Sequence, residues 1–299
     1  MGYINTVVIL GGINIIAALG LAILTGYTGL FSIGHSGFMA LGGYMAAALV
    51  MELQVPFIPA LIGGGLFAGL CSLLIGYPTF RSQLRGDYFA IATFGFAEAV
   101  RLLLNNTYSV IGGSYGYQLP PRTNLPLVLG VVVVALLLAH SFVRSQYGKN
   151  CIAVKEDAVA ARMMGVNVLR TQLTALFISA FYAGVAGGLF GFYMAYLSPS
   201  MFTLTRSSDL LAAVVFGGMQ SLIGPLLAAF VLVAVPEVLR VFTDWRLIVY
   251  GVMFVIIMVF RPQGLLGYKE LNLDFIGRFI ERLLAWVGRM GRRKAETAP

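Results

Sequence analysis

Long apolar runs recur along almost the whole of this 299-residue chain. Hydrophobic residues make up 59% of the sequence and charged residues only 11%, whereas soluble domains carry about 25% charged residues. Inside a bilayer every backbone polar group needs an internal partner, and a crossing helix needs about 20 apolar residues. The sequence therefore predicts an all-α fold, a polytopic transmembrane helical bundle.

We expect about nine membrane segments, within a range of eight to ten. They cover residues 4–25, 30–51, 57–79, 88–104, 125–143, 171–197, 207–219, 223–239 and 247–260. The segment 207–219 is short for a crossing helix. We favour a short crossing helix shielded by its neighbours, and a re-entrant segment is the alternative.

The basic residues predict an orientation. Residues 80–87, residues 144–170 and the residues after Phe260 hold 15 of the 20 Lys and Arg residues. Cytoplasmic loops carry this excess, so we expect these regions and the C-terminus inside and the N-terminus outside. Because the basic residues flank membrane segments and gather on no soluble face, the net charge of +8 does not indicate nucleic-acid binding.

Two domains are expected, a membrane domain over residues 1–270 and a basic cytoplasmic tail over residues 271–299. The tail has an apolar stripe opposite a basic face, the pattern of an amphipathic helix on the inner membrane surface. Its last basic residues, Arg292, Arg293 and Lys294, favour contact with anionic membrane lipid.

The polar stretch 144–170 is too charged to cross the bilayer, and it predicts a short helix from Lys155 to Met164. Glu156 and Asp157 would lie in its first turn, where acids suit the helix dipole. Gly165 would cap its end.

On this helix Ala158, Ala161 and Met164 would share one face, with Met163 beside it. Two interpretations stay open. Small and flexible apolar residues suit docking into a groove of another protein, and an amphipathic connector packed on its own membrane domain has the same pattern.

Several membrane segments contain glycine. Residues 26–43 interleave glycines with Ser32, His35 and Ser36, which favours an irregular backbone that lines a cavity. The four-residue spacing of Ala180, Gly184 and Gly188, and of Gly65 and Gly69, favours close helix packing.

Ionisable residues within membrane segments are candidates for function. Three local ion pairs are expected from a spacing of three residues: Glu98 with Arg101, Arg206 with Asp209, and Glu237 with Arg240. His35 has no partner nearby in the sequence, and both a pathway-lining role and a structural role stay open for it.

The sequence lacks the motifs of several enzyme classes. No phosphate-binding loop is present, because the Gly148-Lys149 pair is followed by Asn and has no glycine five residues before it. His-Glu-x-x-His and Gly-x-Ser-x-Gly do not occur either, and two scattered cysteines, Cys71 and Cys151, make no metal site. We expect neither an enzyme nor a cofactor in this chain.

The polar stretch also resembles a known motif. Ala160-Ala161, three residues and Gly165 are similar to the coupling loop in permease subunits of binding-protein-dependent ABC importers, although Val159 stands where those proteins usually have Glu. The longer string YGKNCIAVKEDAVAARMMGVNV resembles branched-chain amino acid permeases of the LivM-like type. Resemblance to the same family extends to GYTGLFSIGHSGFMALGGY, RGDYFAIATFGFAEAVRLLLNN, FGGMQSLIGP and FRPQGLLG, and so covers residues 26–267.

The resemblance implies a multi-pass subunit of the bacterial cytoplasmic membrane that imports leucine, isoleucine and valine by ATP-driven alternating access. It implies a second homologous permease subunit, two peripheral ATPases that hold ATP and Mg, and an external binding protein. The coupling residues would be Glu156, Asp157, Ala160, Ala161, Met164 and Gly165. The candidate pathway residues are Ser32, His35, Ser36, Thr93 and Glu98.

Permeases for urea or short amides look similar, so the substrate stays open. The rival class is an ion-coupled secondary amino acid transporter, which needs buried carboxylates facing a midplane site. Glu98 is the one fair candidate for such a carboxylate, and Arg101 is expected to neutralise it.

Overall fold

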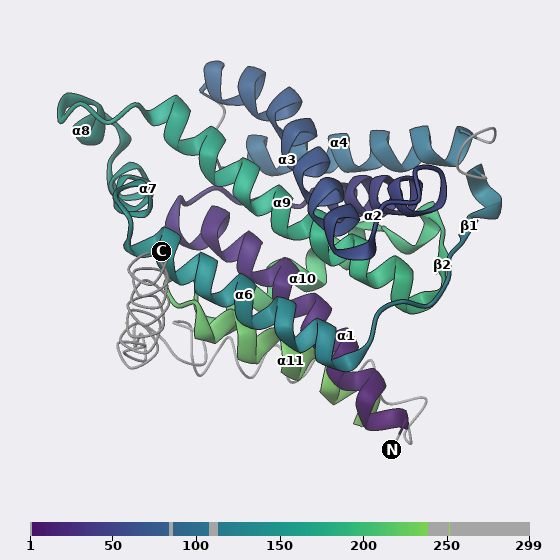
Figure 1. Ribbon diagram of the computed structural model, residues 1–299. Coiled ribbons are helices and arrows are strands. Elements are labelled where there is room, and N and C mark those ends of the chain that lie inside the picture. Colours follow the sequence, from purple (N-terminus) through teal and green to yellow (C-terminus); the bar gives the residue numbers. More distant parts are fainter. Residues whose placement is uncertain (1, 84–85, 108–112, 239–250, 252–299) are drawn as a thin grey trace, which may run out of the picture. The chain divides into compact units, whose positions relative to one another are not determined.

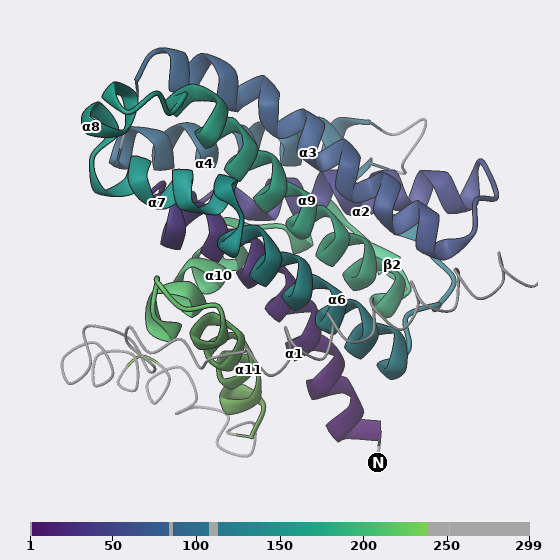
Figure 2. The ribbon, with the colours of Figure 1, turned by 60° about the vertical axis from the view of Figure 1, so that its left-hand side comes forward.

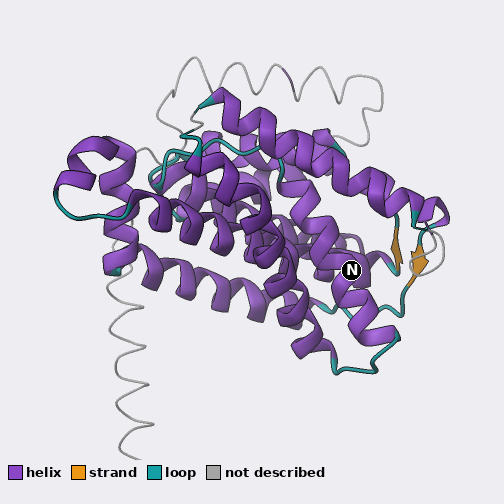
Figure 3. Cartoon of the chain, turned by 90° about the horizontal axis from the view of Figure 1, so that it is seen from above, coloured by secondary structure: helices purple, strands orange, loops and turns teal. Residues whose placement is uncertain are grey.

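A computed structural model describes residues 2–83, 86–107, 113–238 and 251, and most of them are helical (Figures 1 and 3). The longer helices are α1 (Gly2–Leu21), α2 (His35–Met51), α3 (Phe57–Arg81), α4 (Asp87–Asn106), α6 (Leu125–Arg144), α9 (Val168–Met194) and α11 (Ile223–Val238). The shorter ones are the π-helix η1 (Ala22–Tyr27), the 3-10 helices η2 (Gly113–Tyr115) and η3 (Pro199–Met201), and α7 (Gln146–Glu156), α8 (Ala158–Met163) and α10 (Leu204–Gly217). Within the described residues the helical fold is interrupted by one antiparallel pair of two-residue strands, β1 (Tyr117–Gln118) and β2 (Tyr196–Leu197).

Each of the first eight expected membrane segments contains a helix, and the ninth, 247–260, lies outside the described residues except for Gly251. Among the described residues, four helical stretches are long and apolar enough to cross a membrane: Ile4–Tyr27, Phe57–Arg81, Leu125–Arg144 and Val168–Met194. Helix α2 and the apolar part of α11 are shorter. The helical bundle is therefore confirmed, and the number nine stays a prediction, as does the tail 271–299.

Helix α9 lies at the centre of the bundle, where it packs against α1, α2 and α3 (Figure 2). Glycines make this packing close. A side chain at Gly184 would collide with Ala68 and the backbone of Gly65, and one at Gly69 would collide with the ring of Phe177. Ala180 is fully buried. The expected small-residue packing is therefore confirmed, because helices that meet backbone to backbone leave no room for a Cβ atom.

The chain between α1 and α2 is irregular, as the sequence predicts, but the prediction for residues 26–43 is wrong in its second half, because residues 35–43 form the start of the regular helix α2. The last turns of α1 widen into η1, residues 28–34 form no regular helix, and α2 begins at His35. Thr25 and Thr28 donate from Oγ1 to the carbonyls of Leu30 and Ile23, each at 3.1 Å. These bonds satisfy backbone groups that a regular helix would have paired, which is a condition for irregular backbone inside a membrane domain.

The helix ends gather into two groups. Helix α7 lies beside η1, and the connection after α10 lies there too, because the Tyr27 hydroxyl donates to the Gln220 carbonyl at 3.4 Å. The strands lie in the second group of helix ends, next to the C-terminal end of α2, where the Tyr117 hydroxyl donates to Glu52 Oε1 at 3.3 Å. Helix α10 follows β2 and η3, and its C-terminal end lies next to η1. That the short segment 207–219 crosses the membrane stays a prediction.

Candidate functional site

Two helices, rather than the expected single one, follow α6 outside the apolar bundle. Helix α7 ends at Glu156, and α8 begins at Ala158. Asp157 separates them with φ −151° and caps α8, since its Oδ1 accepts hydrogen bonds from the amides of Val159 at 2.7 Å and Ala160 at 3.0 Å. The prediction that Glu156 and Asp157 share a first turn is wrong, because an Asp side chain that bonds the amides ahead of it starts a new helix at that point.

Gly165 ends α8 as the sequence predicts. Its φ is +85°, a conformation that glycine adopts without steric cost. The Gly165 amide donates to the Arg162 carbonyl and the Val166 amide to the Ala161 carbonyl, both at 3.0 Å. This pair of bonds closes a helix and turns the chain sharply, and here it directs residues 166–167 toward α9.

The expected apolar face of this helix is wrong in part. Ala158 and Ala161 pack inward with Val154 and Val168. Met163 and Met164 are 83% and 85% exposed, and Val159 and Ala160 are exposed as well. We call Val159, Ala160, Met163 and Met164 the α8 apolar face. Its alanine neighbours stabilise the turn, whereas the methionines are available for contact.

Lys155 bonds this region to η1, at the start of the irregular connection between α1 and α2. Its Nζ donates to the Gly26 carbonyl at 2.8 Å, and its stem lies against Gly29, whose φ is +73°. Partial burial lowers the pKa of Lys155, and the neighbouring Glu156 carboxylate opposes that shift. Sequence reasoning missed this residue, since nothing in the local pattern indicates a bond to a carbonyl 129 residues away.

Four of the five pathway candidates lie together and buried at the start of α2. His35 Nε2 lies 2.7 Å from Ser179 Oγ on α9. The Ser36 amide donates to Ser207 Oγ on α10 at 2.9 Å, and that hydroxyl donates in turn to Ser36 Oγ at 2.8 Å. The start of α2 is thereby bonded to two other helices.

The remaining two residues of this cluster hold the irregular segment itself. Thr93 Oγ1 on α4 accepts from the Ile33 amide at 3.2 Å, and Ser32 Oγ accepts from the Gly34 amide at 3.3 Å. A side chain at Gly34 would collide with the Thr93 carbonyl. All four candidates therefore bond protein atoms, and their role in a pathway stays a prediction.

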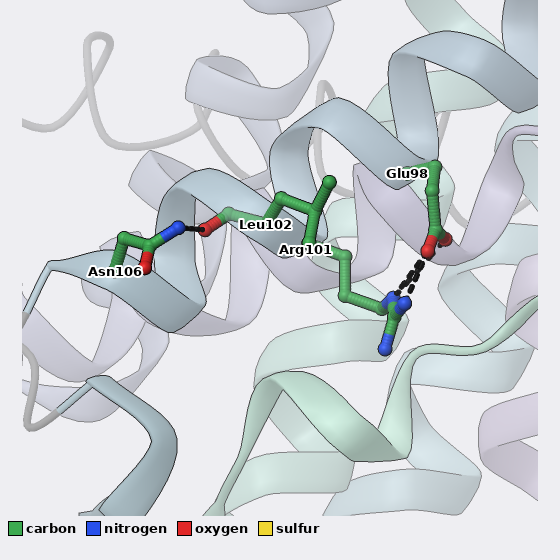
Figure 4. Close-up of polar contacts among 4 residues, drawn as sticks. All are labelled: Glu98, Arg101, Leu102 and Asn106. Atoms are coloured by element: carbon green, nitrogen blue, oxygen red, sulfur yellow. Dashed lines mark hydrogen bonds and ion pairs between the residues drawn. The ribbon is translucent and has the colours of Figure 1, made fainter.

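The fifth candidate, Glu98, is paired with Arg101 on the same helix (Figure 4). The Arg101 Nε donates to both Glu98 carboxylate oxygens at 3.0 Å, and its Nη2 donates to Oε1 as well. The side chains are about one-third exposed, at 35% for Glu98 and 33% for Arg101. The expected ion pair is confirmed, so Glu98 is not an isolated intramembrane carboxylate.

The expected contact ion pair between Arg206 and Asp209 does not form, although the two charges attract each other electrostatically. Arg206 Nη2 donates instead to Asn14 Oδ1 on α1 at 2.8 Å, and its guanidinium carbon lies 4.9 Å from the centre of the Phe190 ring. Asn14 could have been found in the sequence as a polar residue inside an apolar run, but its partner could not. The third pattern, Glu237 and Arg240, lies outside the residues whose side chains are described.

Comparisons with known proteins agree with this architecture. The family described as "Branched-chain amino acid transport system / permease component" matches residues 3–258. The chain is 35% identical over 289 residues to the high-affinity branched-chain amino acid transport system permease protein LivM of Escherichia coli K12, covering 85% of this chain and 68% of that protein.

Two further relatives widen the comparison. LivH of Salmonella typhimurium, a permease protein of the same named system, is 25% identical over 295 residues, 89% of this chain and 94% of that protein. The autoinducer 2 import system permease protein LsrC of Klebsiella pneumoniae is 29% identical over 212 residues, 68% of this chain and 53% of that protein. No solved structure matches significantly. With a family match over most of its length, the chain belongs to the permease components of branched-chain amino acid transport systems.

Proposed function

We propose that this chain is a transmembrane permease subunit of a binding-protein-dependent ABC importer that moves leucine, isoleucine and valine inward by ATP-driven alternating access. The observation that carries the proposal is the 35% identity to LivM over 85% of the chain. The bacterial cytoplasmic membrane is its proposed location, with α7, α8 and the C-terminus on the cytoplasmic side.

The proposed assembly has several chains. Because this chain is similar to both LivM and LivH, a second homologous permease subunit completes a heterodimer. Two peripheral ATPases bind ATP and Mg, since this sequence has no phosphate-binding loop, and an external binding protein delivers the substrate. Membrane lipid surrounds the bundle.

The α8 apolar face docks on the ATPases in this proposal. Its methionines adapt to an apolar groove, and Asp157 and Gly165 hold the two ends of the helix in place. Ala160 and Met164 make contact, Ala161 supports the turn from inside, and Glu156 lies exposed at the bend. These six residues keep the coupling role implied by the resemblance, with Met163 added.

Lys155 gives the coupling a physical route. A displacement of α8 moves α7, and the Lys155–Gly26 bond carries that movement to η1 and the irregular residues 28–34. This segment leads directly to Ser32, His35 and Ser36, and the Ile33 amide within it donates to Thr93 on α4. We propose that rearrangement of this buried cluster opens the pathway to one side or the other.

Two experiments test the function. Pull-down of the tagged full chain from its native membrane is expected to recover a second permease and ATPases with phosphate-binding loops, and the reconstituted complex with its binding protein is expected to take up radiolabelled leucine only with ATP. Recovery of the chain alone, with uptake that ignores ATP, contradicts the proposal.

The docking face has a matched control. Met163→Glu with Met164→Glu is expected to release the ATPases from the complex, because two charges replace apolar contacts. Tyr147→Glu, an exposed position at the start of α7, is expected to retain them. Equal retention in both variants contradicts the role of the α8 apolar face.

Two alternatives make different predictions. A permease for urea or short amides takes up those compounds with ATP and leaves leucine outside. An ion-coupled secondary transporter responds to an ion gradient and loses uptake with Glu98→Gln, an outcome that the Glu98–Arg101 pair speaks against.

A further inference from the structure

A polar cavity of about 200 Å³ lies between α1, α10 and α11. Its polar wall contains Asn14, Arg206 and Asp209, and its aliphatic wall contains Leu210, Leu232 and Val233. A basic group and an acidic group thus share one small space with branched apolar side chains. Pockets for drug-sized molecules are typically 300 Å³ or more, so this cavity suits a smaller ligand.

The cavity reaches the middle depth of the membrane domain. Asn14 lies ten residues from Ile4, the start of the apolar stretch Ile4–Tyr27, a rise of about 15 Å along a helix. Arg206 bonds the Asn14 side chain at 2.8 Å, so its guanidinium lies at that depth. A charge held there is costly and commonly marks a substrate or ion pathway.

The guanidinium of Arg206 is held in place by Asn14 and attracts the Asp209 carboxylate electrostatically without forming a contact ion pair with it. Asn14 is a neutral acceptor, and the Phe190 ring offers only its face. Within the described residues Asp209 makes no hydrogen bond or ion pair, and Asn14 is the only hydrogen-bond partner of Arg206. Both charged groups therefore keep bonding capacity toward the cavity.

We propose that this cavity binds the transported α-amino acid as its zwitterion. The substrate carboxylate pairs with Arg206, whose planar fork suits two parallel bonds to a carboxylate. The substrate ammonium pairs with Asp209, and the branched aliphatic side chain packs on Leu210, Leu232 and Val233. This assignment rests on the proposed function and deepens it, because neutral urea and short amides would leave both charges unpaired.

The charged wall is tested in the complete reconstituted complex with its binding protein. Arg206→Met and Asp209→Asn are each expected to lower ATP-driven leucine uptake at least about tenfold, since each removes a charge-assisted bond to the substrate. ATP hydrolysis stimulated by the loaded binding protein is expected to stay within about twofold of wild type, because the coupling elements are untouched. Thr205→Ala and Ser208→Ala are the controls, since both residues are exposed on α10 and neither lines the cavity.

The aliphatic wall is tested without changing a charge. Leu232→Trp fills the cavity and is expected to lower leucine uptake at least about fivefold, a loss of about 1 kcal/mol. Leu227→Trp adds the same bulk at an exposed position on α11 outside the cavity and is expected to transport like wild type.

The outcomes separate the two proposals. A wild-type complex that takes up no leucine with ATP contradicts the proposed function. A wild-type complex that does, together with Arg206→Met and Asp209→Asn complexes within about twofold of its uptake, overturns the binding site and leaves the function standing. Should Arg206→Met fail to assemble, normal uptake by assembled Asp209→Asn and Leu232→Trp complexes overturns the site equally.

Discussion

Helices α4 and α10 each carry an acidic and a basic residue three positions apart, but the two basic residues choose different partners. On α4, Glu98 and Arg101 are three residues apart and form an ion pair. On α10, Arg206 and Asp209 have the same spacing, yet Arg206 bonds Asn14 on another helix. A spacing of three residues therefore allows a local pair but does not decide it.

Two physical differences explain the contrast. On α4 the acid precedes the base, the order that the helix dipole favours, and on α10 the order is reversed. Arg206 also lies in the first turn of α10, where a positive charge faces the positive end of the dipole. Asn14 and Phe190 offer it a better environment, whereas the Glu98–Arg101 pair lies on a partly exposed face of α4.

The largest expected effect comes from removing the competing partner. Asn14→Leu is expected to lower the free energy of unfolding by about 2–3 kcal/mol, because it leaves a partly buried guanidinium without its acceptor. Thermal unfolding of the purified chain in detergent measures this, with Asn14→Asp as the control that keeps an oxygen acceptor. Unchanged stability would mean that Arg206 turns to Asp209 at no cost, and the two patterns would then be equivalent.

A smaller effect is expected on α4. A double-mutant cycle with Glu98→Gln and Arg101→Gln is expected to give a coupling energy of about 0.5–1 kcal/mol, because the pair is partly exposed and its geometry is good. The same unfolding assay measures all four proteins of the cycle. A coupling energy near zero would show that the geometric pair contributes nothing.

Reversing the order on α4 sharpens the comparison. Glu98→Arg combined with Arg101→Glu keeps both charges and the spacing, and it is expected to weaken the coupling by roughly 0.2–0.5 kcal/mol, as the dipole argument requires. The comparison is with the wild-type coupling energy from the cycle. Equal values would assign the contrast wholly to Asn14 and Phe190.

The smallest effect on stability is expected at Asp209. Asp209→Asn is expected to change the free energy of unfolding by less than about 0.5 kcal/mol, because the carboxylate has no bonding partner among the described residues. Its effect on leucine uptake is expected to be far larger, and that difference separates a ligand-binding group from a structural one. A destabilisation as large as that of Asn14→Leu would place Asp209 among the structural residues.

Much of the fold can be predicted from local pattern. Apolar runs predict the helices, and glycines at four-residue spacing predict the close packing around α9. The glycines and serines of residues 26–43 predict an irregular connection, which the structure has over residues 28–34. The polar stretch 144–170 is less predictable from its sequence. Asp157 has the side chain of a helix cap, yet the same residue also suits a first turn, and the sequence does not distinguish a bent pair of helices from one.

The sequence by itself determined that this chain is a helical membrane protein of a permease family, because hydrophobic length and motif strings depend only on neighbours along the chain. Only the tertiary structure decided that Lys155 bonds the Gly26 carbonyl and that Ala161 is buried while Met164 is exposed. It also decided that Arg206 forms its hydrogen bond with Asn14 and not with Asp209. Each of these outcomes depends on which side chain of a distant helix offers the lower free energy. Packing decides that competition. It brings Lys155 and Gly26, which are 129 positions apart in the sequence, and Arg206 and Asn14, which are 192 positions apart, within hydrogen-bonding distance.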